Sequence, residues 1–254
     1  MPTPHPTYPK PTIVQVLCEI AFSSDEEINL RAAELYPTFS SEFPEIQPVQ
    51  TQVQLQFMVG QPVPVPPLQP QPNLNSAFRF TTSEGKRFVQ ISNTSFVYQS
   101  TEPYLGWKAF KEKLLELWLA SQPRTKASTI TKVGLRYINR IVLTKKHPRL
   151  SDWLQPTDDL PKALISSKEN FLGRVESSPM PSHLRLVTLA RQPSGPDWPI
   201  GAVVLDIDRI TMTQFDAVER QIAKNLEILH EDVWASFDSS STKTLKSYLF
   251  GRLK

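Results

Sequence analysis

Two arginines and an asparagine interrupt the otherwise apolar stretch TKVGLRYINRIVL at 131–143. The stretch is typical of a β-strand, in which successive side chains point to opposite faces of the sheet. Arg136 and Arg140 then share one face, about 13 Å apart at the usual strand rise, whereas Asn139 lies on the apolar face. Because a buried amide needs hydrogen-bond partners, we expect Asn139 to bond to a bulge or a neighbouring loop.

Charged residues recur with the same alternation in other segments that read as strands. In AVVLDIDRI, at 202–210, two aspartates point away from the face that carries the valine, leucine and isoleucine side chains. If these strands belong to one sheet, one face is apolar and packs under helices. The opposite face then carries the candidate site residues, namely Glu19, Arg79, Arg136, Arg140, Arg185, Asp206 and Asp208.

This polar face has two interpretations that the residues leave open. Cross-strand Arg–Asp and Arg–Glu pairs are ordinary on a solvated sheet face, and each contributes little to stability. Alternatively, the face is the floor of a concave site whose arginines bind an anionic ligand bidentately, while Asp206 and Asp208 hold a divalent ion. No third carboxylate at a fixed spacing supports the aspartate pair, so neither a metal site nor a cofactor is predicted.

The other residues that could do chemistry are few. His5 lies in a proline-rich tail, His147 in the basic turn TKKHPR, His183 at the start of a strand, and His230 in ILHEDVW on the last helix. We interpret His230 as a hydrogen-bonding residue on the helix surface or against the sheet rather than as a general base. The sequence has no G-x-S-x-G motif, no phosphate-binding glycine pattern and no Cys/His cluster suited to zinc, so no catalytic residue is assigned.

The composition is that of a soluble globular protein. The chain has 254 residues, 39% hydrophobic and 21% charged, with 28 basic and 25 acidic side chains. Such a balanced charge is not that of a nucleic-acid-binding groove, so we expect no nucleic-acid partner. The only cysteine, Cys18, excludes an intrachain disulfide. No stretch approaches the roughly 18 apolar residues of a membrane span, and the first residues lack a secretory signal pattern, so we expect a cytoplasmic protein without membrane contact.

Proline is unusually frequent, with 24 residues against 8 glycines. Residues 1–11 contain five prolines and residues 61–72 contain six, which predicts an extended or irregular backbone in both segments. We therefore expect an N-terminal tail at 1–11 and a loop at 61–72. Residues 12–254 are expected to form a single domain, or two closely packed halves at about 12–125 and 126–254.

The periodicity of apolar residues predicts strands that form meanders separated by single helices. The expected strands lie at 12–22, 50–60, within 77–100, and at 131–143, 171–178, 183–192 and 201–212. The expected helices lie at 26–43, 106–122, 150–155, 214–237 and 242–253. This order favours an α+β fold, with a mostly antiparallel sheet and helices packed on one face. The loose similarity of the two halves favours a pseudo-duplicated arrangement.

Several sequence blocks occur together in a recognisable order: YPKPTIVQVLCEIAF, SEFPE, PYLGWKAFKEKL, GLRYINRI, VVLDID and LEILHEDVWASF. With these blocks the chain, from about residue 8 to residue 251, resembles a sporadically distributed family of uncharacterised bacterial proteins. GLRYINRI is the most specific block, and the proline-rich segment 61–72 departs from the usual pattern. The family has no assigned activity, so the resemblance implies no catalytic residue. Its sporadic distribution implies an accessory, defence or toxin–antitoxin-type locus.

From these observations we expect a non-enzymatic component that acts through a protein partner or as a homo-oligomer. The lack of a catalytic constellation, the proline-rich segments and the aromatic residues Tyr8, Tyr104 and Trp198 favour this interpretation. The alternative is a binder or hydrolase of a phosphorylated small ligand that uses the Arg/Asp-lined sheet face. A third class, nucleic-acid binding through the basic residues at 145–149, would show a steep loss of affinity with salt.

Overall fold

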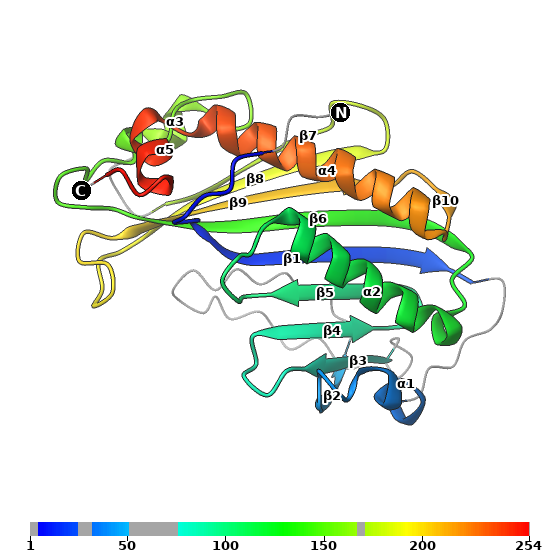
Figure 1. The fold of residues 1–254 in the computed structure, drawn as a ribbon. Helices are drawn as coiled ribbons and strands as arrows, with labels where there is room; N and C mark the ends of the chain where they lie inside the picture. Colours follow the sequence, from blue (N-terminus) through cyan, green and yellow to red (C-terminus); the bar gives the residue numbers. More distant parts are fainter. Residues whose placement is uncertain (1–4, 25–31, 51–75, 167–170, 254) are drawn as a thin grey trace, which may run out of the picture.

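The computed structural model describes residues 5–24, 32–50, 76–166 and 171–253 (Figure 1). These residues form one continuous ten-stranded sheet in which every pairing is antiparallel, and the long helices pack against one of its faces. The α+β fold predicted from the sequence is therefore confirmed. Within the described residues, none of the helices combines the length and the apolar character that crossing a membrane requires.

The strands follow the order β2-β3-β4-β5-β1-β6-β9-β8-β7 across the sheet, and β10 pairs with the beginning of β6. Their bounds are Ile13–Ser23 (β1), Glu45–Gln50 (β2), Ser76–Thr81 (β3), Arg87–Ile91 (β4), Ser95–Ser100 (β5), Thr129–Val142 (β6), Leu172–Ser177 (β7), His183–Gln192 (β8), Ala202–Thr211 (β9) and Phe215–Asp216 (β10).

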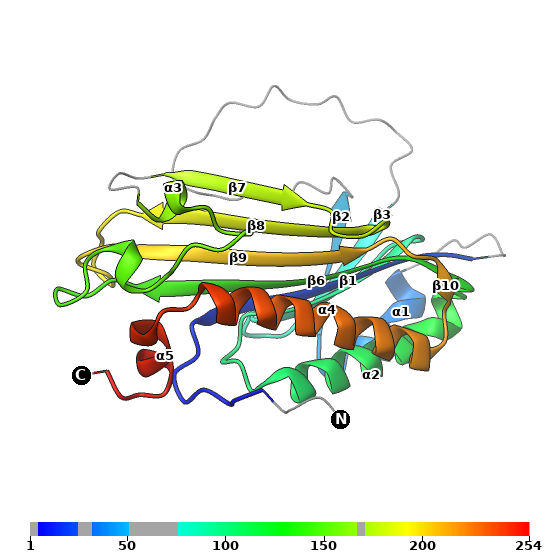
Figure 2. The same ribbon diagram turned by 90° about the horizontal axis from the view of Figure 1, so that it is seen from above.

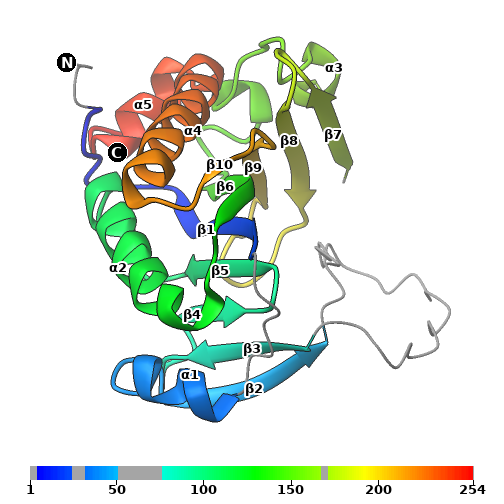
Figure 3. The same ribbon diagram turned by 90° about the vertical axis from the view of Figure 1, so that its right-hand side faces the viewer.

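Two of the helices are long and three are short. Their bounds are Ala32–Phe39 (α1), Trp107–Thr125 (α2), Lys162–Ile165 (α3), Glu219–Ser240 (α4) and Lys243–Leu249 (α5), with a single 3₁₀ turn at Leu150–Asp152. Helix α2 packs over the strands of the first half of the sheet and α4 lies over β6 and β9 (Figures 1 and 2). At one end of the sheet, β7 lies away from the two long helices (Figure 3).

The two halves of the sheet share one order of connections. β1 and β6 pair with each other at the centre. After each of them the chain passes through a helical segment, reaches an edge strand, β2 or β7, and returns strand by strand to the centre. Each half then ends in a long helix, α2 or α4. This order is the pseudo-duplicated arrangement, with the sheet continuous across the pair of central strands.

The core lies between the sheet and the helices and follows the strand periodicity. Val16, Cys18, Ile20 and Phe22 alternate along β1 and are all buried. Trp118 of α2 covers this row and meets the rings of Phe22 and Phe96 edge-on, with centroids 5.7 and 5.6 Å apart. Large aromatic side chains of this kind dominate the burial that holds a helix to a sheet.

Some of the elements differ from the prediction. The predicted helix at 214–237 begins only at Glu219, because residues 215 and 216 pair with Ile130 and Thr129 of β6 as a short strand. The first residues of the predicted helix at 26–43, most of the predicted strand at 50–60, and the proline-rich loop at 61–72 lie outside the described residues.

Candidate functional site

Arg136 is paired with a carboxylate of the protein. Its Nε and Nη2 donate to the two carboxylate oxygens of Asp206, at 2.8 and 2.9 Å. Both side chains are buried, with 7% and 3% of their residue surface exposed. A bidentate arginine–carboxylate pair of this kind satisfies two strongly polar groups that would otherwise be costly to bury. The fork of Arg136 that would hold an anion is thus directed to a carboxylate of the protein.

Two further acidic residues lie around this pair. Asp208 is directly opposite Arg136 in the β6–β9 register, and Glu19 on β1 accepts a hydrogen bond from Lys132 at 2.7 Å. Burial raises the pKa of Asp208 to about 6, with Asp206 and Glu19 adding to the rise and Arg136 opposing it. Burial also raises the pKa of Asp206, although its bonds to Arg136 act in the opposite direction.

Arg79 and Arg140 lie on the same sheet face but are separated from this cluster. Arg79 is on β3, four strands away from β6, or roughly 19 Å at the usual strand spacing. It donates to Gln90 at 2.8 and 3.1 Å, and its guanidinium lies over the ring of Phe88. Arg140 lies over the ring of Trp198, 5.0 Å from its centroid. The structure does not bring these two arginines together with Arg136 to hold one ligand.

The expectation that Arg185 shares this face is wrong. In the β8–β9 register Arg185 is opposite Arg209, whereas Leu186 is opposite Asp208. Arg185 therefore points to the helix side of the sheet, where it donates to both carboxylate oxygens of Asp232 on α4, at 2.6 and 2.8 Å. The alternation along β8 is as predicted, but the register with β9 places Arg185 beside Arg209.

Arg209, which the sequence did not single out, is the most deeply buried charge in this region. Its side chain is 1% exposed and lies under α4. It donates to Asp159 at 2.8 Å and forms an ion pair with Asp232 at 3.0 Å. Asp232 thus holds two arginines at once and ties α4 to β8 and β9. This network stabilises the packing of the helix on the sheet.

Asn139 is buried on the helix side of β6, as predicted. The hydroxyl of Thr12 donates to its Oδ1 at 3.0 Å, and its Nδ2 donates to the carbonyl of Leu205 at 3.4 Å. Thr12 belongs to the segment that leads into β1, so the expected loop partner is confirmed. Asn139 also lines a cavity on this side of the sheet.

This cavity has a volume of about 440 Å³ and lies between the N-terminal segment, the start of α2 and the middle of α4. Ile13, Tyr137 and Asn139 form its floor on the sheet. Its walls come from the N-terminal segment, the turn before α2, α4 and α5, and include Tyr8, Tyr104, Trp107, Glu227, His230, Trp234 and Leu249.

Aromatic rings pack in pairs around the cavity. The imidazole of His230 lies flat on the indole of Trp107, with centroids 4.3 Å apart. His5 stacks on Trp234 at 4.4 Å. The hydroxyls of Tyr104 and Tyr137 meet at 3.2 Å. Each of these pairs joins segments that are far apart in the sequence.

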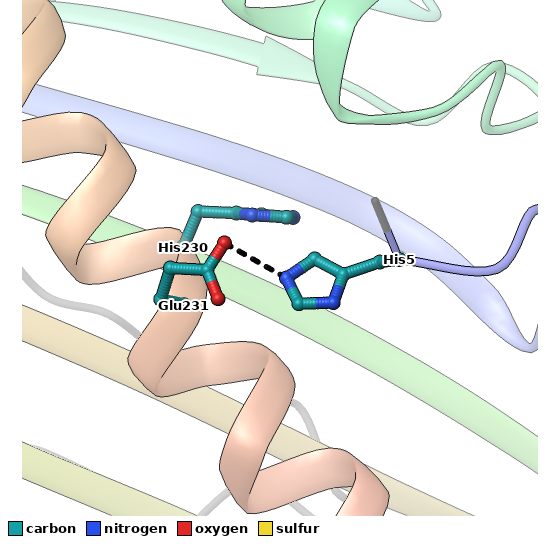
Figure 4. Close-up of side chains that lie close together, drawn as sticks. All are labelled: His5, His230 and Glu231. Atoms are coloured by element: carbon teal, nitrogen blue, oxygen red, sulfur yellow. Dashed lines mark hydrogen bonds and ion pairs between the residues drawn. The ribbon is translucent and has the colours of Figure 1, made fainter. Parts of the chain in front are cut away.

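The N-terminal segment is fixed where it borders the cavity. The backbone N–H of Lys10 donates to the carbonyl of Leu249 at 3.1 Å. The ring of Tyr8 packs between Trp234 and Phe250. From there the segment places His5 beside α4, where its Nε2 lies 2.9 Å from Oε1 of Glu231 (Figure 4). The described part of the predicted tail is therefore a wall of the cavity.

Several polar side chains that line the cavity have pKa values shifted from their ordinary values. Burial, together with the nearby His5, lowers the pKa of His230 to about 4. His230 is 7% exposed, and among the described residues its Nδ1 has no hydrogen-bond partner. Burial raises the pKa of Tyr104 to about 12. For Glu227 burial acts to raise the pKa, but the bonds from Lys111 and Trp107 outweigh it and the pKa is lowered.

Sequence reasoning missed this cavity because its walls come from five separate segments. His230 was placed on the last helix and expected to bond there, but not to lie buried against Trp107. His5 was assigned to a tail on the grounds of its proline-rich surroundings, which carry no periodicity. One signal was available: the aromatic residues of PTYPKP, PYLGW and HEDVW each stand at the boundary or on the face of an element.

A scan against protein-family models finds no match to this chain, and a search of curated proteins finds no significant match.

Proposed function

We propose that this protein binds a small, flat aromatic molecule in the cavity between the N-terminal segment, α2 and α4, and that the ligand is uncharged or positively charged. One observation carries the proposal: paired aromatic side chains from separate segments surround a cavity of about 440 Å³. The cavity also contains a buried imidazole nitrogen that no described residue hydrogen-bonds. Ligand cavities in proteins typically measure about 300–1,000 Å³ and combine apolar walls with a few polar groups.

The aromatic walls favour a planar ligand. Stacked or edge-on aromatic pairs contribute about 0.5–1.5 kcal/mol beyond the burial of their area. Trp107, Trp234, Tyr8 and Tyr104 all line the cavity, and each is only partly buried by the protein. A ring that enters the cavity would therefore contact the exposed parts of these aromatic side chains.

The charges of the lining disfavour an anion. Glu227 and Glu231 both border the cavity. Lys108 borders it too, but its side chain is 85% exposed and is oriented to Glu112 on the outer surface of α2. Aromatic rings also attract cations through their π-faces. An amine or an uncharged heterocycle thus suits the cavity better than a carboxylate or a phosphate does.

The arginine-bearing face gives less support to the alternative, a phosphorylated ligand. Arg136 is engaged by Asp206, Arg185 lies on the other face, and Arg79 and Arg140 are distant from each other. The non-enzymatic role, the protein partner and the accessory or defence context stay predictions from the sequence. Binding without catalysis agrees with the non-enzymatic role.

The test compares ligands that share one ring but differ in charge. Dialysed protein would be titrated calorimetrically with tryptamine, indole and indole-3-acetate, after a wider screen of aromatic fragments by ligand-observed NMR. We expect the affinity to be highest for tryptamine, lower for indole and lowest for indole-3-acetate. Trp107→Leu should weaken binding at least tenfold.

Trp198→Ala is the matched control, because Trp198 is also half-buried but lies outside the cavity. It should leave binding unchanged. If no uncharged or cationic aromatic fragment binds, or if Trp198→Ala reduces the affinity as much as Trp107→Leu does, the proposal fails.

A further inference from the structure

Three side chains at one end of the cavity are suited to a metal ion. His5, His230 and Glu231 each offer one ligand atom, and these atoms all lie within 4.8 Å of one another. Figure 4 shows the carboxylate of Glu231 directed at the imidazole of His5, with the ring of His230 beside them. In the described part of the chain this is the one group of three or more such residues.

A second observation points to a missing ligand at the same place. His230 is more than nine-tenths buried and lines the cavity, yet its Nδ1 has no hydrogen-bond partner among the described residues. Buried polar atoms in folded proteins are nearly always satisfied, and leaving one unpaired costs about 1–3 kcal/mol. A partner that enters from the cavity would remove this cost.

We propose that His5, His230 and Glu231 form a binding site for one divalent transition-metal ion, with Zn²⁺ the best fit. Two imidazoles and one carboxylate are a donor set that zinc uses in proteins, with a fourth position left to water or to a ligand. Imidazole favours zinc, copper and nickel over magnesium and calcium, which prefer sites made of oxygen atoms.

The geometry requires only local movement. Bonds of about 2.0–2.2 Å in a tetrahedral site place the ligand atoms roughly 3.4 Å apart. His5 and Glu231 already meet at 2.9 Å, and both side chains are partly exposed, so their torsions can change without repacking the core. The ring of His230 is held in place by its stacking on Trp107. This stacking fixes the orientation of the ring, which in metal-ligating histidines is usually done by a hydrogen bond from the second ring nitrogen.

Contacts of the segment that precedes β1 hold His5 where it can serve as a ligand. Tyr8 packs between Trp234 and Phe250, and Lys10 is hydrogen-bonded to the backbone of Leu249. These contacts hold the segment within a few residues of His5. The metal would then join the N-terminal segment to α4, with its fourth coordination position facing the cavity.

This inference does not depend on the proposed aromatic ligand, because the metal can be tested alone. Untagged, dialysed full-length protein would be titrated calorimetrically with Zn²⁺, and Co²⁺ would report the coordination geometry by its visible absorption. The variants are His5→Ala and Glu231→Gln, both at partly exposed side chains. The matched control is His183→Ala, which removes a partly buried imidazole on β8, away from the cavity.

We expect one Zn²⁺ per chain and a Co²⁺ spectrum of tetrahedral intensity in the wild type and in His183→Ala. His5→Ala and Glu231→Gln should each weaken Zn²⁺ binding at least tenfold, while their circular dichroism and metal-free melting temperature stay close to those of the wild type. The inference is overturned if the wild type binds no stoichiometric Zn²⁺, if neither variant changes the affinity, or if His183→Ala lowers it as much as they do.

Discussion

The imidazole of His230 lies parallel to the indole of Trp107, with the two ring centroids 4.3 Å apart and the planes inclined by only 5°. Trp107 is the first residue of α2 and His230 lies in the middle of α4. The contact thus joins the two long helices beside the cavity, and the indole N–H of Trp107 adds a 2.8 Å hydrogen bond to Glu227 of α4. Trp107, His230 and Glu227 therefore contribute both to the packing of α2 against α4 and to the shape of the cavity.

Replacing Trp107 should separate the role of its ring from the role of its N–H group. Trp107→Phe keeps an aromatic face but loses the bond to Glu227, and it should lower the free energy of unfolding by about 1 kcal/mol. Trp107→Leu loses the stacking as well and should lower it by about 2 kcal/mol. Urea denaturation measures both values. Equal effects of the two variants would mean that the stacking on His230 contributes nothing.

Removing Arg136 should destabilise the fold rather than abolish a binding activity. Arg136→Ala leaves the carboxylate of Asp206 buried and unpaired, which should lower the free energy of unfolding by about 3–5 kcal/mol. The double variant Arg136→Met, Asp206→Leu removes both charges and should regain most of that loss. Denaturation of the two variants side by side measures the difference. If Arg136→Ala leaves the free energy of unfolding unchanged, the pair with Asp206 is not structural and Arg136 is again a candidate for binding a ligand.

Asp208 should make the stability depend on pH. Its pKa rises from the ordinary 3.8 to about 6 in the fold, so between these values the folded state binds more protons than the unfolded state does. Stability should therefore fall as the pH rises from about 4 to about 6, and then level off. Arg136, Asp206, Glu19 and Arg209 are the charged groups that act on it.

The variant Asp208→Asn removes this dependence. Because Asp208 is partly exposed, we expect a gain of only about 1 kcal/mol at pH 7, and no gain near pH 4. Chemical denaturation at a series of pH values measures both. Asp158→Asn, at an exposed aspartate, is the control and should be neutral. A gain that persists at pH 4 would show that the effect is not one of titration.

Asp232 should be the most sensitive member of the ion network under α4. It pairs with both Arg185 and Arg209, and the side chain of Arg209 is almost fully buried. Asp232→Asn should lower the free energy of unfolding by about 2 kcal/mol, less than a lone buried pair because Asp159 still binds Arg209. Arg185→Ala, at a side chain that is 35% exposed, should cost about 1 kcal/mol or less. The reverse order would contradict the network described.

The elements of this fold were predictable wherever one face of a strand or helix is buried. Alternation along β1, β6 and β9 identified their apolar faces, and the aromatic stripe of α2 identified its buried side. Alternation along one strand does not reveal which face of the neighbouring strand lies on the same side of the sheet, because that depends on the register of the pairing. Leu184 and Leu186 favour the interpretation that their face of β8 is the core face. That interpretation predicts Arg185 on the same face as Arg136, whereas the structure has it opposite Arg209.

The candidate site was less predictable for a related reason. Its residues come from the N-terminal segment, β1, the start of α2, β6, α4 and α5, and no local spacing relates them. His5 and Glu231 are 226 positions apart yet hydrogen-bonded. Besides the aromatic residues, Asn139 gave a usable sign, since an amide on an apolar strand face marks a place where the chain must supply polar partners.

The most direct test of the aromatic cavity uses the five tryptophans of the chain as reporters. With ¹⁵N-labelled tryptophan, each indole N–H gives one signal, which single Trp→Phe variants assign. Titration with tryptamine should shift the signals of Trp107 and Trp234, which line the cavity, and leave those of Trp118, Trp153 and Trp198 in place. Saturable shifts confined to Trp118, Trp153 and Trp198, or no shifts at all, would contradict the proposal that this cavity is the binding site.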